Sequence, residues 1–203
     1  MNLRSSFTYP FLILIVLFGC SSSNTLLTVN QQLDLPGSVN KLLVLALTPV
    51  DDNRETGEKE VVYWLREQNY DAVASFDIMS VRGRLPVKEE IVKTMTENGF
   101  DGILTMRLVD VNQESQYVSP GTNSNYYFYN YLSAWSGYYR PGYIDKSRLI
   151  KVESNLYIFP KAEIAYSAIS ESFISDSFET FAADFSKPLV KSLKKTKLLV
   201  AKE

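Results

Sequence analysis

The chain has 203 residues, with 21 basic and 23 acidic side chains and a formal net charge of −2. This near balance argues against a nucleic-acid partner, which requires a clustered basic surface. The sequence contains one cysteine and no histidine, which excludes Ser-His-Asp and Cys-His catalysis, histidine metal sites and a disulfide within the chain.

The first twenty residues have the features of a secretory signal that ends at a cysteine. Arg4 supplies the positive charge, and residues 11–18 form an apolar run too short to span a bilayer. The segment Leu17-Phe18-Gly19-Cys20 resembles the lipobox of bacterial lipoproteins. That resemblance implies cleavage after residue 19 and acylation of Cys20 by palmitate-type chains. An ordinary signal cleaved elsewhere, or an uncleaved anchor, is the alternative.

The residue after the cysteine indicates the membrane to which a lipoprotein is delivered. Ser21, rather than an aspartate, follows Cys20; by resemblance to known sorting patterns this implies the outer membrane, facing the periplasm. Residues 20–40 are rich in Ser, Asn, Gln and Thr and predict a lipidated N-terminus and tether, with a short strand at 26–29. Residues 41–203 are expected to form one folded domain.

The domain begins with a pattern of alternating strands and helices. The apolar run 41–48 predicts a central strand buried on both faces. A helix is expected at 54–68, with Asp52 and Glu55 in capping-box spacing. Residues 72–76 predict a short second strand.

A second helix is expected from Pro86 to Asn98, with Gly99 as its left-handed cap, and a long strand at 100–111 follows. Two crossover helices of this kind make the first three strands parallel. The first half of the domain is therefore predicted to be α/β.

The second half predicts an antiparallel hairpin and a terminal helix. Residues 147–159 and 163–174 alternate in polarity. The helix after Asp176, which has capping-box spacing with Glu179, has an apolar face and is expected to kink or divide at Pro188. Residues 198–200 predict an edge strand or a frayed end. Lysines that complement the helix dipole and solvate its outer face follow late in the chain: Lys187, Lys191, Lys194, Lys195 and Lys197.

The fold class predicted is therefore α/β: a single domain with a mixed sheet of about five strands, three of them parallel. The order of elements and the segments 41–48, 98–104 and 157–173 resemble those of uncharacterised bacterial envelope lipoproteins. More distantly they resemble the TolB N-terminal-like fold of curli secretion lipoproteins and of penicillin-binding-protein activator lipoproteins. The resemblance implies an accessory or scaffolding role in the envelope and transfers no catalytic motif.

An aromatic loop at 119–143 is the most unusual segment of the chain. Tyrosines on a glycine-containing loop offer a large contact area at low entropic cost, as is typical of binding surfaces. The loop could contact a protein, a membrane or a glycan, or cover an open sheet face. The predicted binding residues are Tyr126, Tyr127, Tyr129, Tyr131, Trp135, Tyr138 and Tyr139.

Carboxylates are the remaining candidates for acid or base chemistry. Asp51 and Asp52 follow the first strand, at the edge where open α/β sheets bind ligands. Asp110 and Glu114 lie on and beyond the third strand. Helix capping, and an ion pair of Asp110 with Arg107 or Arg148, are the structural alternatives. The turn at 82–84, with two arginines, could meet an anion or simply be solvated.

The sequence thus predicts a membrane-anchored envelope lipoprotein that is not an enzyme and has no cofactor or metal. Its expected role is contact with an envelope protein or with copies of itself through the aromatic loop. A glycan- or peptidoglycan-binding module is the first alternative, and a carboxylate-dependent hydrolase is the second.

Overall fold

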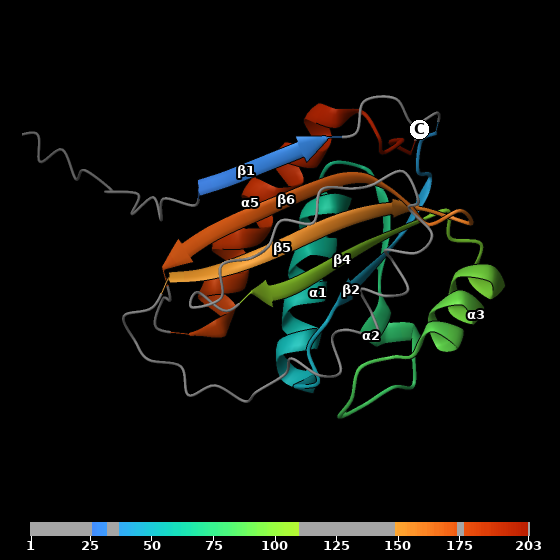
Figure 1. Cartoon of the computed structure of the whole chain (residues 1–203), viewed down its shortest axis with the longest axis horizontal. Helices are drawn as coiled ribbons and strands as arrows, with labels where there is room; N and C mark the ends of the chain where they lie inside the picture. The colour runs from blue at the N-terminus through green and yellow to red at the C-terminus, as the bar shows by residue number, and fades with distance from the viewer. Residues whose placement is uncertain (1–25, 32–36, 110–148, 174–176, 203) are drawn as a thin grey trace, which may run out of the picture.

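The computed structural model describes residues 26–31, 37–109, 149–173 and 177–202. Its centre is a six-stranded sheet in the order β1-β6-β5-β4-β2-β3 (Figure 1). The strands are β1 (Leu26–Gln31), β2 (Lys41–Ala46), β3 (Asp71–Ala74), β4 (Gly102–Val109), β5 (Leu149–Ile158) and β6 (Glu163–Phe173). The described helices are α1 (Asp51–Arg66), α2 (Ser75–Ile78), α3 (Lys88–Asn98) and α5 (Phe178–Thr196).

The strand directions confirm the predicted α/β class. Strand β2 is parallel to both β3 and β4, while β4, β5 and β6 are antiparallel to one another in turn. Strand β1, expected as a short element of the tether, pairs antiparallel with β6. The sheet therefore has six strands rather than about five.

Strand β2 is buried on both faces, as its continuous apolar run predicts. Leu42 and Val44 belong to the core between the sheet and helices α1 and α5. Leu43 and Leu45 point to the opposite face, where they join a smaller core with α3. The sheet is thus the middle layer between two apolar clusters.

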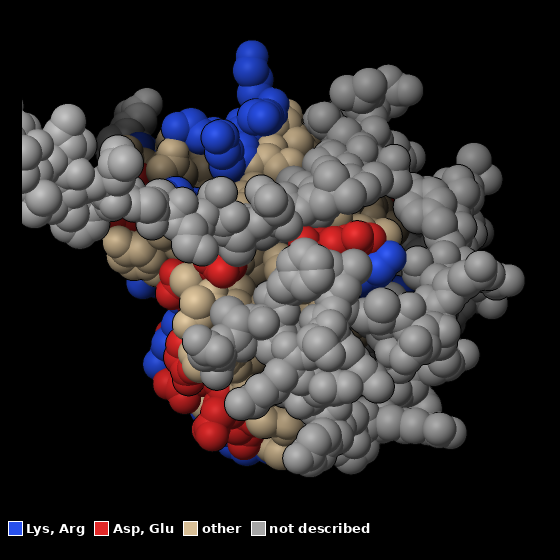
Figure 2. All heavy atoms as spheres, turned by 90° about the vertical axis from the view of Figure 1, so that its left-hand side faces the viewer, with Lys and Arg blue, Asp and Glu red and all other residues tan. Residues whose placement is uncertain are grey.

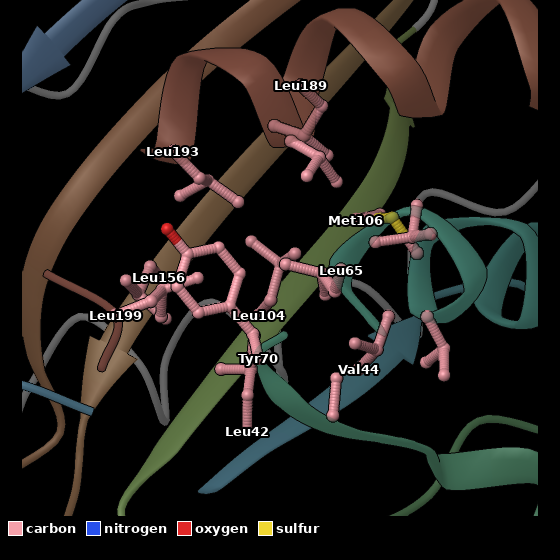
Figure 3. Close-up of a cluster of buried hydrophobic side chains, with 14 of the residues drawn as sticks. Leu42, Val44, Leu65, Tyr70, Leu104, Met106, Leu156, Leu189, Leu193 and Leu199 are labelled. Atoms are coloured by element: carbon pink, nitrogen blue, oxygen red, sulfur yellow. The ribbon is translucent and has the colours of Figure 1, made fainter. Parts of the chain in front are cut away.

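The larger core fills the space between the sheet, α1 and α5. Figure 3 shows side chains from these elements meeting around Leu104 and Leu156, and Leu65 of α1 and Leu189 of α5 are both fully buried there. Leu199, beyond α5, also reaches this cluster, and its backbone forms an isolated bridge with Val39. Burial of such side chains is the main stabilising term for the domain.

Several helix ends differ from the predicted ones. Helix α1 starts at Asp51, with Val50 as its N-cap and no side-chain cap; the capping box of Asp52 and Glu55 is therefore wrong. Helix α5 starts at Phe178, and the Ser177 hydroxyl accepts a hydrogen bond from the Thr180 amide at 3.2 Å. The N-cap of α5 is thus Ser177 rather than Asp176.

Two other predictions about helix geometry have opposite outcomes. Gly99 has a φ of 66° and ends α3 in the left-handed region, as predicted. Pro188 lies inside α5 but does not divide it, because the helix is continuous from Phe178 to Thr196.

None of the helices in the described part of the chain is both long and apolar enough to cross a membrane.

A buried ion pair joins α1 to the sheet and to α2. Arg54 and Glu58 are both fully buried. The Glu58 Oε1 atom accepts hydrogen bonds from the Ala46 amide at 2.9 Å, the Ser75 hydroxyl at 2.8 Å and Arg54 Nε at 3.1 Å. Its Oε2 atom accepts from the Phe76 amide at 2.6 Å.

Arg54 is satisfied by further acceptors on the same side of the helix. Its Nη1 and Nη2 atoms donate to the Val81 carbonyl at 3.0 Å and to the Ser75 hydroxyl at 2.7 Å. Burial raises the pKa of the Glu58 carboxyl, while Arg54 and the donated hydrogen bonds act in the opposite direction. The partners of this pair lie on β2, on α2 and in the segment at Val81, so the pair ties these three segments to α1.

Replacing Glu58 by Ala should lower the free energy of unfolding by about 3–5 kcal/mol, because it leaves a buried Arg54 charge unpaired and two amides without an acceptor. Glu55→Ala is the matched control, since Glu55 makes an ion pair with Lys59 on the exposed face of the same helix and should matter little. Urea unfolding of both variants measures the difference. Equal losses would contradict a structural role for the buried pair.

Candidate functional site

A small apolar recess lies at the carboxyl ends of β2 and β4, between α1 and α5. Phe178, Phe181 and Phe185 line it from α5, with ring centroids 5.7 and 6.3 Å apart along the series. The other lining residues come from β2 and its continuation, α1, β4, β5 and α5: Ala46, Leu47, Thr48, Asn53, Gly57, Met106, Arg107, Leu108, Val152 and Ala182.

The recess is suited to a small apolar group. Its volume is about 50 Å³, well below the roughly 300–1,000 Å³ of pockets that enclose drug-sized ligands. The atoms that line it are mostly apolar. It lies at the edge where open α/β sheets usually bind their ligands, and its size matches a single aliphatic side chain.

Gly57 is the unexpected member of this lining. It lies inside α1, where glycine is less favourable than alanine by roughly 1 kcal/mol. A Cβ atom at this position would be 3.8 Å from the Phe178 ring, an ordinary contact distance. Backbone conformation and packing therefore do not require glycine here, and the missing methyl group leaves the recess wider.

Of the predicted carboxylates, only Asp51 and Asp52 lie within the described residues. The Asp51 carboxylate accepts a hydrogen bond from the Gly83 amide at 2.9 Å, and Asp52 is exposed; neither lines the recess. Asp110 and Glu114 lie outside the described residues. Within the described ranges, no group of three or more Asp, Glu, Cys or His side chains is placed to hold a metal ion.

The two arginines of the turn at 82–84 are engaged in structural contacts. Arg82 donates to the Met79, Val81 and Phe76 carbonyls and lies 3.8 Å from the Phe76 ring centroid. Arg84 makes a charged hydrogen bond of 2.6 Å with Glu90. This ion pair, together with the Val87 amide, lowers the pKa of Glu90 to about 2. The turn is thus organised by its own neighbours.

A row of charged side chains crosses β4, β5 and β6 on the sheet face opposite α5. Arg107 pairs with Glu153, and Lys151 pairs with Glu171 at 2.7 Å. Glu153 is therefore an ion-pair partner of Arg107; the alternative pairing of Asp110 with Arg107 or Arg148 lies outside the described residues. Burial raises the pKa of Tyr157 on the same face. These pairs satisfy one another across neighbouring strands.

The residues predicted to carry lipid and partner binding lie outside the described ranges. They are Cys20, Tyr126, Tyr127, Tyr129, Tyr131, Trp135, Tyr138 and Tyr139.

The recess itself was missed by sequence reasoning, which assigned the phenylalanines of α5 to an ordinary apolar stripe. The available signal was Gly57, a residue that opposes helix formation in an otherwise helical segment.

No protein-family model and no curated protein matches the chain. Two solved structures of PelC from Paraburkholderia phytofirmans, each described as a dodecamer, are similar to it. One covers 89% of this chain and 100% of the PelC chain, with 12% identity and a TM-score of 0.46. The other, a substituted form of PelC, covers 85% and 99%, with 12% identity and a TM-score of 0.44.

Gly57→Ala should raise the free energy of unfolding by roughly 0.5–1 kcal/mol, because it improves helix propensity without a steric conflict. Gly102→Ala is the contrasting control, since a Cβ atom there would lie 2.5 Å from a methyl group of buried Val39 and should destabilise the domain. Thermal unfolding distinguishes the two. A loss of stability in Gly57→Ala would show that the helix needs this glycine.

Proposed function

We propose that this protein is a lipid-anchored envelope protein, not an enzyme, that binds a protein partner through an apolar contact. Acylated Cys20 attaches it to the outer membrane on the periplasmic side, and the partner inserts an apolar side chain between α1 and α5. The aromatic residues of 119–143 add to the same contact. A second copy of the chain is one such partner.

The proposed anchor is supported by the sequence. An apolar run of signal length ends at the single cysteine, within a segment that resembles a lipobox. Acyl chains contribute about 0.8 kcal/mol for each buried methylene, so two or more chains give stable attachment. A folded domain on a short tether then remains at the membrane surface.

The observation that carries the binding proposal is the apolar recess at the carboxyl ends of β2 and β4. Leu108 and Val152 line it, and they belong to β4 and β5, the two strands between which the chain runs through residues 110–148. The aromatic loop is therefore connected at both ends to strands that form the recess. A partner at the recess would lie close to both connections.

The composition of the recess favours a protein side chain over a sugar. Sugar hydroxyl groups that lose water need polar partners, whereas Phe181, Phe185 and Met106 offer apolar surface. A hydrolase would need free acid and base groups at this edge, but the Asp51 carboxylate is hydrogen-bonded to Gly83. Glycan binding and hydrolysis therefore remain the less favoured functions.

Replacing Cys20 by Ser should abolish acylation, and with it the membrane attachment that the acyl chains provide, because serine has no thiol to accept the lipid. Mass spectrometry of the N-terminal peptide, together with membrane fractionation, measures both effects. Ser21→Ala is the control that retains the thiol and should remain acylated. Retention of an acyl mass in Cys20→Ser would overturn the proposed anchor.

Filling the recess should weaken partner capture. Ala182 lines the recess and is buried, whereas its neighbour Ala183 is exposed on the other side of α5. Ala182→Leu and Ala183→Leu therefore make the same change on two faces of one helix. In a crosslinking pull-down from membranes, Ala182→Leu should lose a protein that the wild type and Ala183→Leu both retain.

Proteins and muropeptides in the eluate are both analysed, and the melting temperature of each variant is measured. Loss of muropeptides with no loss of protein would favour the glycan function instead. If Ala182→Leu unfolds the domain, Gly57→Ala provides a milder filling of the same recess. Full capture by a folded Ala182→Leu variant would remove the recess from the binding surface.

A further inference from the structure

A basic surface covers the carboxyl-terminal half of α5. Its members are five exposed lysines spaced along the outer side of the helix and at its cap: Lys187, Lys191, Lys194, Lys195 and Lys197. Figure 2 shows basic side chains gathered at the top of this view, at the height of the carboxyl-terminal half of α5 in Figure 1, while acidic side chains lie lower, interspersed with other basic ones. Positive charge is thus concentrated on this part of α5 despite the small net charge of the chain.

These five lysines form no ion pair with a described carboxylate, whereas four other lysines of the domain do. Lys59, Lys93, Lys151 and Lys202 each lie within 4.0 Å of a carboxylate. Of the five lysines on α5, Lys187 lies over the Trp64 ring at 5.0 Å and Lys194 donates to Gln68 at 2.7 Å. No described carboxylate forms an ion pair with any of the five, so their charge is available to an external anion.

The position of α5 relative to the N-terminus favours one kind of anion. Helix α5 packs beside β1, an edge strand of the described sheet (Figure 1). Strand β1 begins at Leu26, six residues after Cys20. Even fully extended, a segment of that length spans at most about 20 Å. A membrane anchor at Cys20 therefore keeps the Leu26 end of β1, and with it this edge of the sheet, within reach of the lipid headgroups.

We propose that the lysine surface of α5 docks on anionic phospholipid headgroups and fixes the orientation of the anchored domain. The inference rests on the proposed anchor at Cys20, since an unanchored domain would have no reason to present this side. Each lysine close to an anionic membrane strengthens the attraction roughly fivefold. The attraction decays within a Debye length of about 10 Å at 0.1 M salt, so it acts only on a domain that is already close.

The test uses the protein expressed from the whole sequence and purified from membranes, with Trp135→Phe, which leaves Trp64 as the single tryptophan. Trp64 lies beside Lys187 and reports on this surface. Energy transfer from Trp64 to a dansyl headgroup lipid is measured in vesicles of phosphatidylcholine alone, or of equal parts phosphatidylcholine and phosphatidylglycerol. Co-sedimentation with the neutral vesicles measures the anchor separately.

Transfer should be about twofold higher on the anionic vesicles, and high salt should remove the difference. The variant Lys191→Gln, Lys194→Gln and Lys195→Gln should lose it, while Lys88→Gln, Lys93→Gln and Lys161→Gln should keep it. The control removes the same charge from exposed positions away from α5.

Two failures are distinguishable. If the wild-type protein does not sediment with neutral vesicles, the proposed anchor is wrong, and the orientation falls with it. If the protein sediments with both vesicles but transfer does not depend on lipid charge or on the lysines of α5, the docking proposal is overturned while the anchor stands. Loss of muropeptide capture in the α5 variant, with lipid contact unchanged, would instead assign the surface to an anionic glycan.

Discussion

The buried carboxylate of Glu58 is the contact on which the rest of the domain depends. It accepts amide hydrogen bonds from Ala46 at the end of β2 and from Phe76 in α2, and it pairs with Arg54 one turn earlier in α1. Helix α1 cannot slide along the sheet without leaving charges and amides unpaired in the interior. Ala46 and Gly57, which adjoin this network, also line the recess. The interaction that positions α1 therefore also sets the width of the candidate binding site.

Local rules account for the parts of the fold that the sequence predicts well. The uninterrupted apolar run of β2 requires apolar neighbours on both faces, and the two cores supply them. Gly99 ends α3 because the left-handed conformation costs glycine little. Helix α5 follows its apolar periodicity, although it does not divide at Pro188 as expected. In each case the cause lies within a few residues of the feature, so the pattern in the sequence is sufficient.

The missed features depend on contacts between distant segments. Arg54 and Glu58 are spaced like a solvent-exposed helix pair, yet they continue the inward stripe of Val61 and Leu65 toward the helix N-terminus. Their burial is explained by acceptors and donors on β2, α2 and the loop near Val81, which no local pattern places there. The first residue of α1 and the position of the recess also depend on contacts between distant segments. Asp51 bonds to Gly83 instead of capping the helix, and the recess appears only where two helices meet the ends of two parallel strands.

Helix α5 links the two proposed contacts in one rigid element. Its amino-terminal half faces the recess with Phe181 and Phe185, while its carboxyl-terminal half carries the lysine surface. Thirteen residues separate Phe181 from Lys194, which corresponds to about 20 Å along a helix. If the lysines rest on the headgroups, the recess lies about 20 Å away from them along the helix. The recess then faces α1 rather than the lipid. The membrane and a protein partner could therefore occupy α5 together, because each would use a different half and a different side of the same helix.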